Sequence, residues 1–183
     1  TRTKAKILAV EIQERLADMA ERSIELNDLT QQMQVIQDDL KNLGRYITGS
    51  KVDMILCNPP YFKVDKQSNL NESQHYLLAR HEISTNLEEI CKIAQRVLKS
   101  NGRLAMVHRP ERFLDILDTM QAHNLAPKRI QFVYPKLGKE ANMLLIVAIK
   151  DGSRDGLKIL PPLFIHNQDG SYTPEIHEIY YGK

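Results

Sequence analysis

Hydrophobic and polar residues follow one another along this chain in blocks that predict strands and helices in turn. Short apolar runs such as 7–10 and 52–57 are typical of buried strands, whereas apolar residues spaced three or four apart are typical of helices with one buried face. We expect strands at 7–10, 33–36, 52–57, 103–107, 129–134 and 143–149, and helices at about 12–27, 85–100 and 110–120.

Each predicted helix carries an apolar stripe and an end signal, which for the first helix is Asn27 as its stop. Thr85 and Glu88 have the spacing of a capping box, Asn101-Gly102 is typical of a helix end, and Pro110 suits a first helical position. The expected inward faces are Ile12, Leu16, Met19 and Ala20 in the first helix, Leu87, Ile90, Cys91, Ala94, Val97 and Leu98 in the second, and Phe113, Leu114, Leu117 and Met120 in the third.

Strands and helices in alternation predict an α/β protein with a Rossmann-like, mostly parallel sheet that has helices on both faces. The loop 135–142 between the last two core strands is short, so we expect these strands to form a terminal antiparallel hairpin. A length of 183 residues fits one domain. Within this domain, residues 151–183 are expected to be a C-terminal extension of loops with one short strand at 163–166.

The composition excludes several classes of protein. With 42% hydrophobic and 26% charged residues, the chain is globular rather than disordered. No apolar run is long enough for a membrane span, and the polar start is not a signal peptide. Cys57 and Cys91 have neither metal-ligand nor disulfide spacing, so we expect reduced thiols in a cytoplasmic protein without a metal site.

Positive charge is concentrated in one part of the chain, although the net charge is only +2. Residues 92–139 hold ten Lys and Arg against three acidic residues, whereas residues 1–50 hold seven against eight. This balance suits contacts with phosphates, and it equally suits the solvated ends of ordinary helices and strands. The candidates for contact with a nucleic acid are Arg109, Arg112, Lys128 and Arg129.

Acidic residues follow the first two predicted strands. Glu11, at the end of the first, can accept hydrogen bonds from both hydroxyls of a ribose. Asp39, after the second, can accept one from the amino group of an adenine while Leu40 packs on the ring. Taken singly, Glu11 is also explained as an acid near a helix N-terminus and Asp39 as a turn residue. Ligands of open parallel sheets bind beyond the carboxyl ends of the strands, which favours the binding interpretation.

The third strand runs directly into Asn58-Pro59-Pro60-Tyr61-Phe62. Each proline restricts the residue before it to extended conformations and has no N–H, so this segment presents carbonyl oxygens in a fixed arrangement. The side-chain oxygen of Asn58 and the carbonyl of Pro59 can accept both hydrogens of one planar NH₂ group. Tyr61 and Phe62 can lie along the face of the planar substrate.

This arrangement suits methylation of an amide or an exocyclic amine. The nitrogen lone pair is delocalised, and two fixed acceptors stabilise the positive charge that develops as the nitrogen attacks the methyl group of a sulfonium. No strong base is required, because the proton becomes acidic only as the methyl group arrives. The ordinary alternative is a Pro-Pro turn after a strand.

Over residues 5 to about 150, the chain resembles the class I S-adenosylmethionine-dependent methyltransferases that modify amino groups. Val10-Glu11 is similar to the ribose-binding strand end of this family, and Asp39-Leu40 to its adenine-binding pair. The resemblance implies S-adenosylmethionine as the cofactor. The implied site residues are Glu11, Asp39, Leu40 and Asn58 for the cofactor, and Asn58, Pro59, Pro60 and Tyr61 for catalysis.

The catalytic motif followed by Leu78-Ala79-Arg80-His81-Glu82 resembles the bacterial tRNA adenine-N6 methyltransferases, which modify the adenine beside the anticodon of a valine tRNA. This resemblance implies tRNA as the partner and the N6 of an adenine as the methyl acceptor. Tyr61, Phe62, Arg80 and His81 would contact the substrate. For Arg80 and His81, a helix surface that ends in a polar turn is the alternative.

One part of the family pattern is absent. The family begins with a strand, a glycine-rich turn and a helix that hold the methionine part of the cofactor, whereas the first glycine here is Gly44. We therefore expect a chain that lacks the first strand and helix, so that these residues alone do not bind the cofactor. Two other functions remain open. One is methylation of a protein glutamine amide, as in the release-factor-modifying family, and the other is RNA binding by a non-catalytic remnant.

Overall fold

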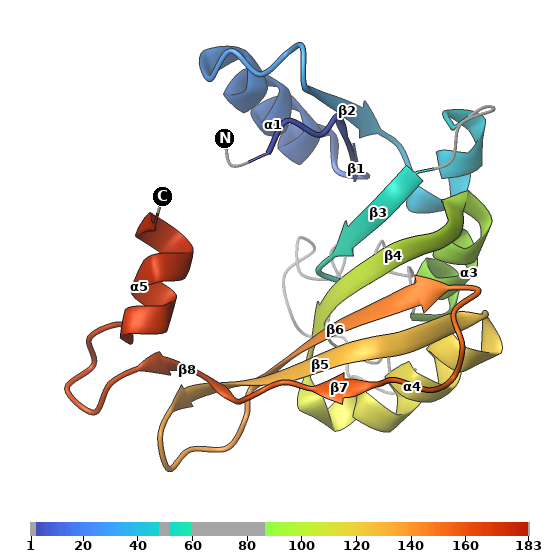
Figure 1. Ribbon diagram of the computed structural model, residues 1–183. Coiled ribbons are helices and arrows are strands. Elements are labelled where there is room, and N and C mark those ends of the chain that lie inside the picture. Colours follow the sequence, from blue (N-terminus) through green and yellow to red (C-terminus); the bar gives the residue numbers. More distant parts are fainter. Residues whose placement is uncertain (1–2, 48–51, 60–86, 183) are drawn as a thin grey trace, which may run out of the picture. The chain divides into compact units, whose positions relative to one another are not determined.

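The computed structural model describes residues 3–47, 52–59 and 87–182, which belong to two compact units, residues 1–51 and 52–183 (Figure 1). The prediction of a single domain is not tested by this division and stays a prediction. Six residues with predicted roles lie outside the described residues, namely Pro60, Tyr61, Phe62, Arg80, His81 and the capping residue Thr85.

The first unit is a strand–helix–strand motif with a short helical turn after it. Strands β1 (Ile7–Glu11) and β2 (Met33–Gln37) pair in parallel along their whole length. Helix α1 (Glu14–Leu26) connects them and packs Ala17 and Ile24 on Val35 of β2. The 3-10 helix η1 (Leu40–Arg45) then follows β2.

The predicted inward face of the first helix is wrong in three positions. Ile12 precedes α1, and Ile12, Leu16 and Met19 are 40–47% exposed. The buried face instead contains Ala17 and Ile24, which are seven residues apart and therefore lie on one side of the helix. Ala20 is partly buried against this cluster, as predicted.

The second unit is built on a sheet in the order β3-β4-β6-β5-β7, with β8 also paired to β5. Its strands are β3 (Val52–Cys57), β4 (Leu98–His108), β5 (Leu125–Lys136), β6 (Met143–Lys150), β7 (Lys158–Ile159) and β8 (Leu163–His166). Strand β6 runs antiparallel to β4 and β5, whereas the β3–β4, β5–β7 and β5–β8 pairs are parallel. The mostly parallel α/β fold with an antiparallel hairpin is confirmed.

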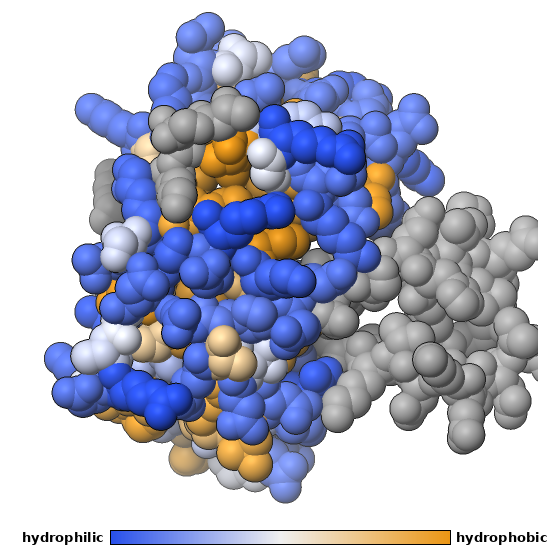
Figure 2. All heavy atoms as spheres, turned by 90° about the vertical axis from the view of Figure 1, so that its right-hand side faces the viewer, coloured by the Kyte–Doolittle hydropathy of each residue, from blue (hydrophilic) through white to orange (hydrophobic). Residues whose placement is uncertain are grey.

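Two helices cover part of this sheet. Helices α3 (Leu87–Val97) and α4 (Phe113–Ala122) contact each other, α3 also contacts β4, and α4 also contacts β5. The predicted stripe of α3 is buried at Leu87, Ile90, Cys91, Ala94 and Val97. In α4, Met120 is buried as predicted, together with Ile116, but Leu114 is 72% exposed and its predicted burial is wrong. Figure 2 shows a mostly hydrophilic face with smaller apolar patches.

The boundary between α3 and β4 differs from the prediction. Leu98, expected to end the helix, is fully buried in β4 opposite Val52. The chain then bulges, because β4 takes five residue steps from Leu98 to Arg103 where β3 takes two from Val52 to Met54. Asn101 has a positive φ of 63°, and a Cβ on Gly102 would lie 2.8 Å from the carbonyl oxygen of Lys99. The Asn101-Gly102 pair therefore serves a tight bulge rather than a helix end.

The C-terminal segment is more regular than predicted. The strand at Leu163–His166 is confirmed, but residues expected to form a loop make helix α5 (Pro174–Tyr181). The side chain of Thr173 caps its N-terminus by accepting a hydrogen bond from the backbone N–H of Ile176, and Pro174 occupies the first turn. Across residues 3–47, 52–59 and 87–182, no helix is long and apolar enough to cross a membrane.

Candidate active site

The two acidic residues predicted to bind the cofactor both lie at the carboxyl ends of β1 and β2. Glu11 is opposite Gln37 in the β1–β2 pair, and Asp39 follows Gln37 by two residues. Both carboxylates accept a hydrogen bond from a backbone N–H two residues further on, at 2.9 Å in each case: Glu11 Oε1 from Gln13, and Asp39 Oδ1 from Lys41. These bonds fix one oxygen of each carboxylate, and Leu40 lies half-buried beside Asp39 at the start of η1.

Sequence reasoning missed Asp38, which organises the turn that carries Asp39. Its Oδ1 accepts hydrogen bonds from the backbone N–H of Asp39 at 2.6 Å and from Asn42 Nδ2 at 2.8 Å. Its Oδ2 accepts one from the hydroxyl of Tyr46 at 2.6 Å. The Tyr46 and Asn42 hydrogen bonds lower the pKa of Asp38, because they stabilise the carboxylate. Asp38 therefore positions η1. In the sequence, this role could have been inferred from its place one residue after the second predicted strand.

The predicted catalytic motif begins where β3 ends. Asn58 is exposed and Pro59 is buried, so the strand and the proline hold the backbone while the asparagine side chain reaches the surface. Burial raises the pKa of the Cys57 thiol to about 11 and that of the Cys91 thiol to about 12. Cys57 precedes Asn58 directly and stays protonated at neutral pH, so it supplies no thiolate nucleophile there.

A histidine that sequence reasoning missed lies at the end of the adjacent strand. Cys57 is opposite Met106, so His108 and Asn58 follow the same edge of the β3–β4 pair. His108 is 2% exposed, and its Nδ1 accepts a hydrogen bond of 2.8 Å from the backbone N–H of Arg109. This bond places the ring proton on Nε2, which makes His108 a neutral hydrogen-bond donor at this edge. In the sequence, His108 could have been recognised as a polar residue at the end of a strand, as Glu11 was.

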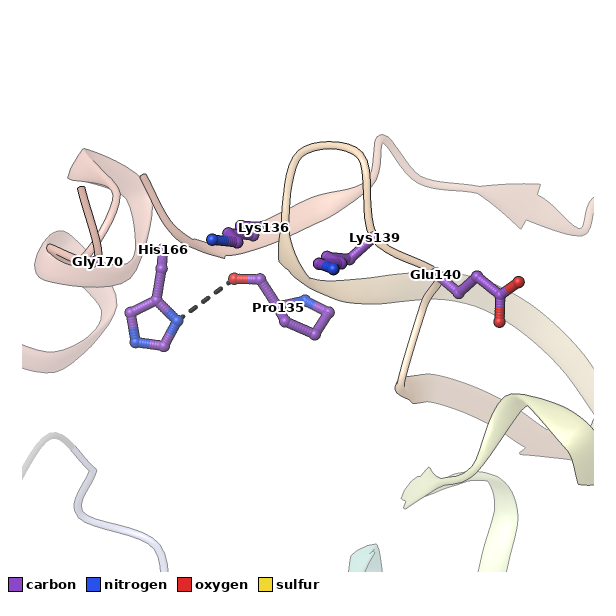
Figure 3. A pocket seen from close by; sticks show the side chains of 6 residues that line it. All are labelled: Pro135, Lys136, Lys139, Glu140, His166 and Gly170. Atoms are coloured by element: carbon purple, nitrogen blue, oxygen red, sulfur yellow. Dashed lines mark hydrogen bonds between the residues drawn. The ribbon is translucent and has the colours of Figure 1, made fainter. Parts of the chain in front are cut away.

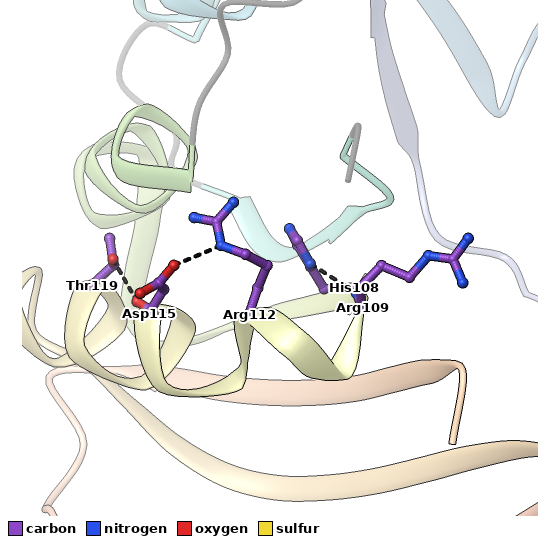
Figure 4. Close-up of polar contacts among 5 residues, drawn as sticks. All are labelled: His108, Arg109, Arg112, Asp115 and Thr119. Atoms are coloured by element: carbon purple, nitrogen blue, oxygen red, sulfur yellow. Dashed lines mark hydrogen bonds and ion pairs between the residues drawn. The ribbon is translucent and has the colours of Figure 1, made fainter. Parts of the chain in front are cut away.

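Two of the predicted substrate-contacting arginines lie at the same edge. Arg109 donates a hydrogen bond from Nη1 to the carbonyl of Asn142 at 3.1 Å. Arg112 forms an ion pair from Nε to Asp115 Oδ2 at 2.6 Å, which leaves its terminal nitrogens pointing to the same side as the His108 ring (Figure 4). Both arginines are half-buried and follow the carboxyl end of β4.

The other two basic candidates lie away from this edge. Arg129 is opposite Val147, which is itself opposite Ala105, three residues before His108. Lys128 holds the loop after β6, because its ammonium donates to the carbonyl oxygens of Ser153, at 2.6 Å, and Asp155. A structural role therefore accounts for Lys128, and contact with a substrate stays a prediction for both residues.

His108 gives the protein a pH-dependent stability. Burial lowers its pKa below 6.5, and the nearby charge of Arg112 lowers it further. The neutral ring therefore stabilises the folded state above pH 6.5, and this contribution is lost as the pH falls through the lowered pKa. We expect urea unfolding to show a larger loss of stability between neutral and mildly acidic pH for the wild type than for His108→Gln.

The comparison between wild type and variant removes the contribution of the other histidines, including His123, which contacts Glu88 at 2.7 Å. Parallel pH profiles for the two proteins would show that folding does not lower the pKa of His108.

The chain is similar to known methyltransferases over most of its length. Residues 1–136 match the profile of the UPF0020 family, described as RMKL-like, methyltransferase domain. A tRNA1(Val) (adenine(37)-N6)-methyltransferase from Porphyromonas gingivalis is 26% identical over 175 residues, which cover 94% of this chain and 68% of that protein.

Two solved structures have the same fold. A predicted O-methyltransferase from Agrobacterium tumefaciens superposes with a TM-score of 0.74 at 22% identity, over 98% of this chain and 78% of that chain. A geranyl diphosphate C-methyltransferase from Streptomyces coelicolor, crystallised with S-adenosyl-L-homocysteine, has a TM-score of 0.56 at 12% identity, over 81% and 64% of the two chains. These likenesses establish the Rossmann-like fold, and residue roles rest on the geometry above.

Proposed function

We propose, on the premise that this chain belongs to the UPF0020 family of RMKL-like methyltransferases, that it methylates an exocyclic amino nitrogen, the N6 of an adenine in tRNA. The methyl donor is S-adenosylmethionine. The observation that carries this proposal is Asn58, an exposed amide at the carboxyl end of the parallel strand β3 and followed directly by the buried Pro59.

The proposed chemistry follows from the groups at this edge. The side-chain oxygen of Asn58 and the carbonyl oxygen of Pro59 accept the two hydrogens of the adenine amino group. These contacts strengthen as the nitrogen becomes positive during attack on the methyl group, so they lower the barrier rather than tighten ground-state binding. Because the Cys57 thiol stays protonated and His108 stays neutral, the edge supplies hydrogen-bonding groups rather than a strong base.

Support for adenine in tRNA comes from two independent directions. The relative from Porphyromonas gingivalis is named for the N6 of adenine 37 in tRNA1(Val). Arg109 and Arg112 follow the same strand edge as Asn58, where two cations suit the phosphates that flank a methylated nucleotide. A glutamine-amide substrate has no phosphates to contact.

The test uses the full-length protein, because these residues alone are expected not to bind the cofactor. It measures methyl transfer from labelled S-adenosylmethionine to bulk tRNA, followed by digestion and analysis of the nucleosides. The expected product is N6-methyladenosine. A parallel reaction offers a protein release factor under the same conditions. Label in methylglutamine instead of methyladenosine would replace this proposal with the glutamine-amide reaction.

The two groups of basic residues are expected to behave differently. Arg109→Gln removes a charge at the catalytic edge while keeping a donor for the Asn142 carbonyl, so it should weaken tRNA binding and lower the slope of log affinity against log salt by about 0.7–0.9. Lys128→Gln should instead lower the melting temperature, because Lys128 holds the 153–155 loop. Filter binding over a salt series measures the first, and thermal unfolding measures the second.

A drop in salt slope for Lys128→Gln equal to that for Arg109→Gln would place both side chains on the RNA. Unchanged slopes for both variants would assign the basic segment to ordinary solvated surface.

A further inference from the structure

The C-terminal segment carries a row of aromatic rings on its surface. His166, at the end of β8, stacks on Tyr172 with ring centroids 5.3 Å apart and planes at 20°. Tyr172 in turn meets Tyr180 of α5 in an edge contact at 5.6 Å. Tyr172 and Tyr180 are 44% and 58% exposed. Contiguous aromatic surface exposed in this way marks an interaction site more often than isolated exposed residues do.

The row is held in place by the core of the second unit. Ile176 of α5 is 3% exposed and packs with Val133 and Leu163. The hydroxyl of Thr173 donates to the carbonyl of Phe164 at 2.7 Å. The rings are therefore presented by an anchored helix and strand, so a ligand that stacks on them meets a preorganised surface.

A positively charged hollow opens beside the His166 end of the row. It is a shallow depression open to solvent, with a volume of about 740 Å³, so a nucleotide would lie on it rather than be enclosed; Figure 3 shows the side chains that line it. The Nδ1 of His166 lies 3.3 Å from the carbonyl of Pro135, which orients the ring at the hollow. The residues that line it are Pro135, Lys136, Lys139, Glu140, His166 and Gly170.

The hollow favours an anion. Within the described part of the chain, neither Lys136 nor Lys139 has an ion-pair partner, and Glu140 is the acidic residue among the six that line the hollow. Two ammonium groups beside an aromatic face are the combination that binds a phosphate and its base together. The flat faces of the His166 and Tyr172 rings can stack on a nucleobase, and the two lysines can contact its phosphate. A protein ligand would instead have to place an apolar side chain on the rings and a carboxylate at the lysines.

Strand register relates this hollow to the catalytic edge. Phe132 of β5 is opposite Leu144, which is opposite His108 of β4. Lys136 lies four residues beyond Phe132 and pairs with His166, so the hollow lies about 13 Å further along the strand direction than the level of His108. Strand β5 also lies two strand spacings from β4, about 10 Å across the sheet, so the total separation is about 16 Å. This distance is too long for the reacting base and suits a nearby nucleotide of the same RNA.

We propose that Lys136, Lys139, His166 and Tyr172 form a site for an unpaired nucleotide that flanks the methylated adenine. The lysines contact its phosphate, and its base extends the His166–Tyr172 stack. We call this the flanking-nucleotide site. It rests on the proposed function only in taking RNA as the substrate, since the site itself contacts no reacting atom.

The test measures binding and methylation separately. A fluorescently labelled single-stranded RNA of about 12 nucleotides is titrated by anisotropy, and KM for bulk tRNA is measured in the methyl-transfer assay. His166→Ala and Tyr172→Ala should each weaken RNA binding by roughly 5- to 150-fold, while Tyr172→Phe should have little effect. Lys136→Glu with Lys139→Glu should lower the salt slope by about 1.4 or more.

The matched control is Arg154→Glu with Lys158→Glu, which makes the same change of charge at exposed positions away from the hollow. Circular dichroism of each variant checks that helix α5 is still folded. If a ring variant unfolds this helix, the double variant Lys136→Glu with Lys139→Glu still tests the site, because it leaves the aromatic rings unchanged. Wild-type affinity for both ring variants, or equal effects of the two charge pairs, overturns the flanking-nucleotide site. Failure of the wild type to methylate tRNA overturns the proposed function instead, and the RNA titration still decides whether the site exists.

Discussion

In the full-length protein, Asn58→Ala is expected to reduce methyl transfer by a factor of about 100 to 1,000 while leaving the fold and the affinity for S-adenosylmethionine nearly unchanged. The side chain is exposed at the end of β3, so its removal leaves no cavity in the core. Its proposed contact strengthens only as charge develops on the substrate nitrogen, so the loss should appear in kcat rather than in KM for the cofactor. Single-turnover methylation of tRNA with labelled cofactor measures the effect.

Asp53→Ala is the matched control for this variant, because Asp53 lies on the same strand and its exposed pair with Lys99 contributes little to stability. It should retain wild-type turnover. Near-normal turnover of Asn58→Ala, alongside a normal control, would remove Asn58 from the catalytic site.

In the full-length protein, Glu11→Gln should raise KM for S-adenosylmethionine by roughly 10- to 150-fold, the cost of weakening charged hydrogen bonds. Glutamine has the same shape and keeps an oxygen that accepts from the backbone N–H of Gln13, so the turn after β1 should survive. The substitution removes the negative charge that strengthens the proposed hydrogen bonds from the two ribose hydroxyls. The turnover rate at saturating cofactor should change much less than KM.

Glu14→Gln provides the comparison, because Glu14 is an exposed acid in the first turn of α1, three residues after Glu11. It should leave KM for the cofactor unchanged. If the two variants raise KM equally, the effect comes from general electrostatics and Glu11 does not bind the ribose.

The sequence predicted the elements of the fold well where local pattern and packing agree. The α3 stripe from Leu87 to Val97 and the antiparallel β5–β6 pair were both expected, because periodicity and turn length report directly on burial and pairing. The buried faces of helices were predicted less well where a helix carries more apolar residues than the core can accommodate. In α1, Leu16 and Met19 are exposed while the small Ala17 is buried, because close approach of the helix to β2 favours the smaller side chain.

The candidate site shows the same division between local and tertiary information. The strand-end positions of Glu11, Asp39 and Asn58 follow from local sequence and are observed. His108 and Asp38 were missed because their roles depend on burial and on partners such as Tyr46. The aromatic row was missed because His166, Tyr172 and Tyr180 are brought together by α5, a helix whose Thr173-Pro174 start was overlooked.

The pairing of β8 with β5 also imposes an order on biosynthesis. Strand β5 receives its hairpin partner β6 soon after synthesis, but the edge that pairs with Leu163–His166 waits until 30 more residues beyond Lys136 have been added. At roughly 5–20 residues per second, this delay is about 2 to 6 s. During that interval the nascent chain exposes an unpaired strand edge, the kind of surface that associates with other chains. Fast translation of the segment after β6, or a chaperone that shields the edge, would therefore improve the yield of folded protein.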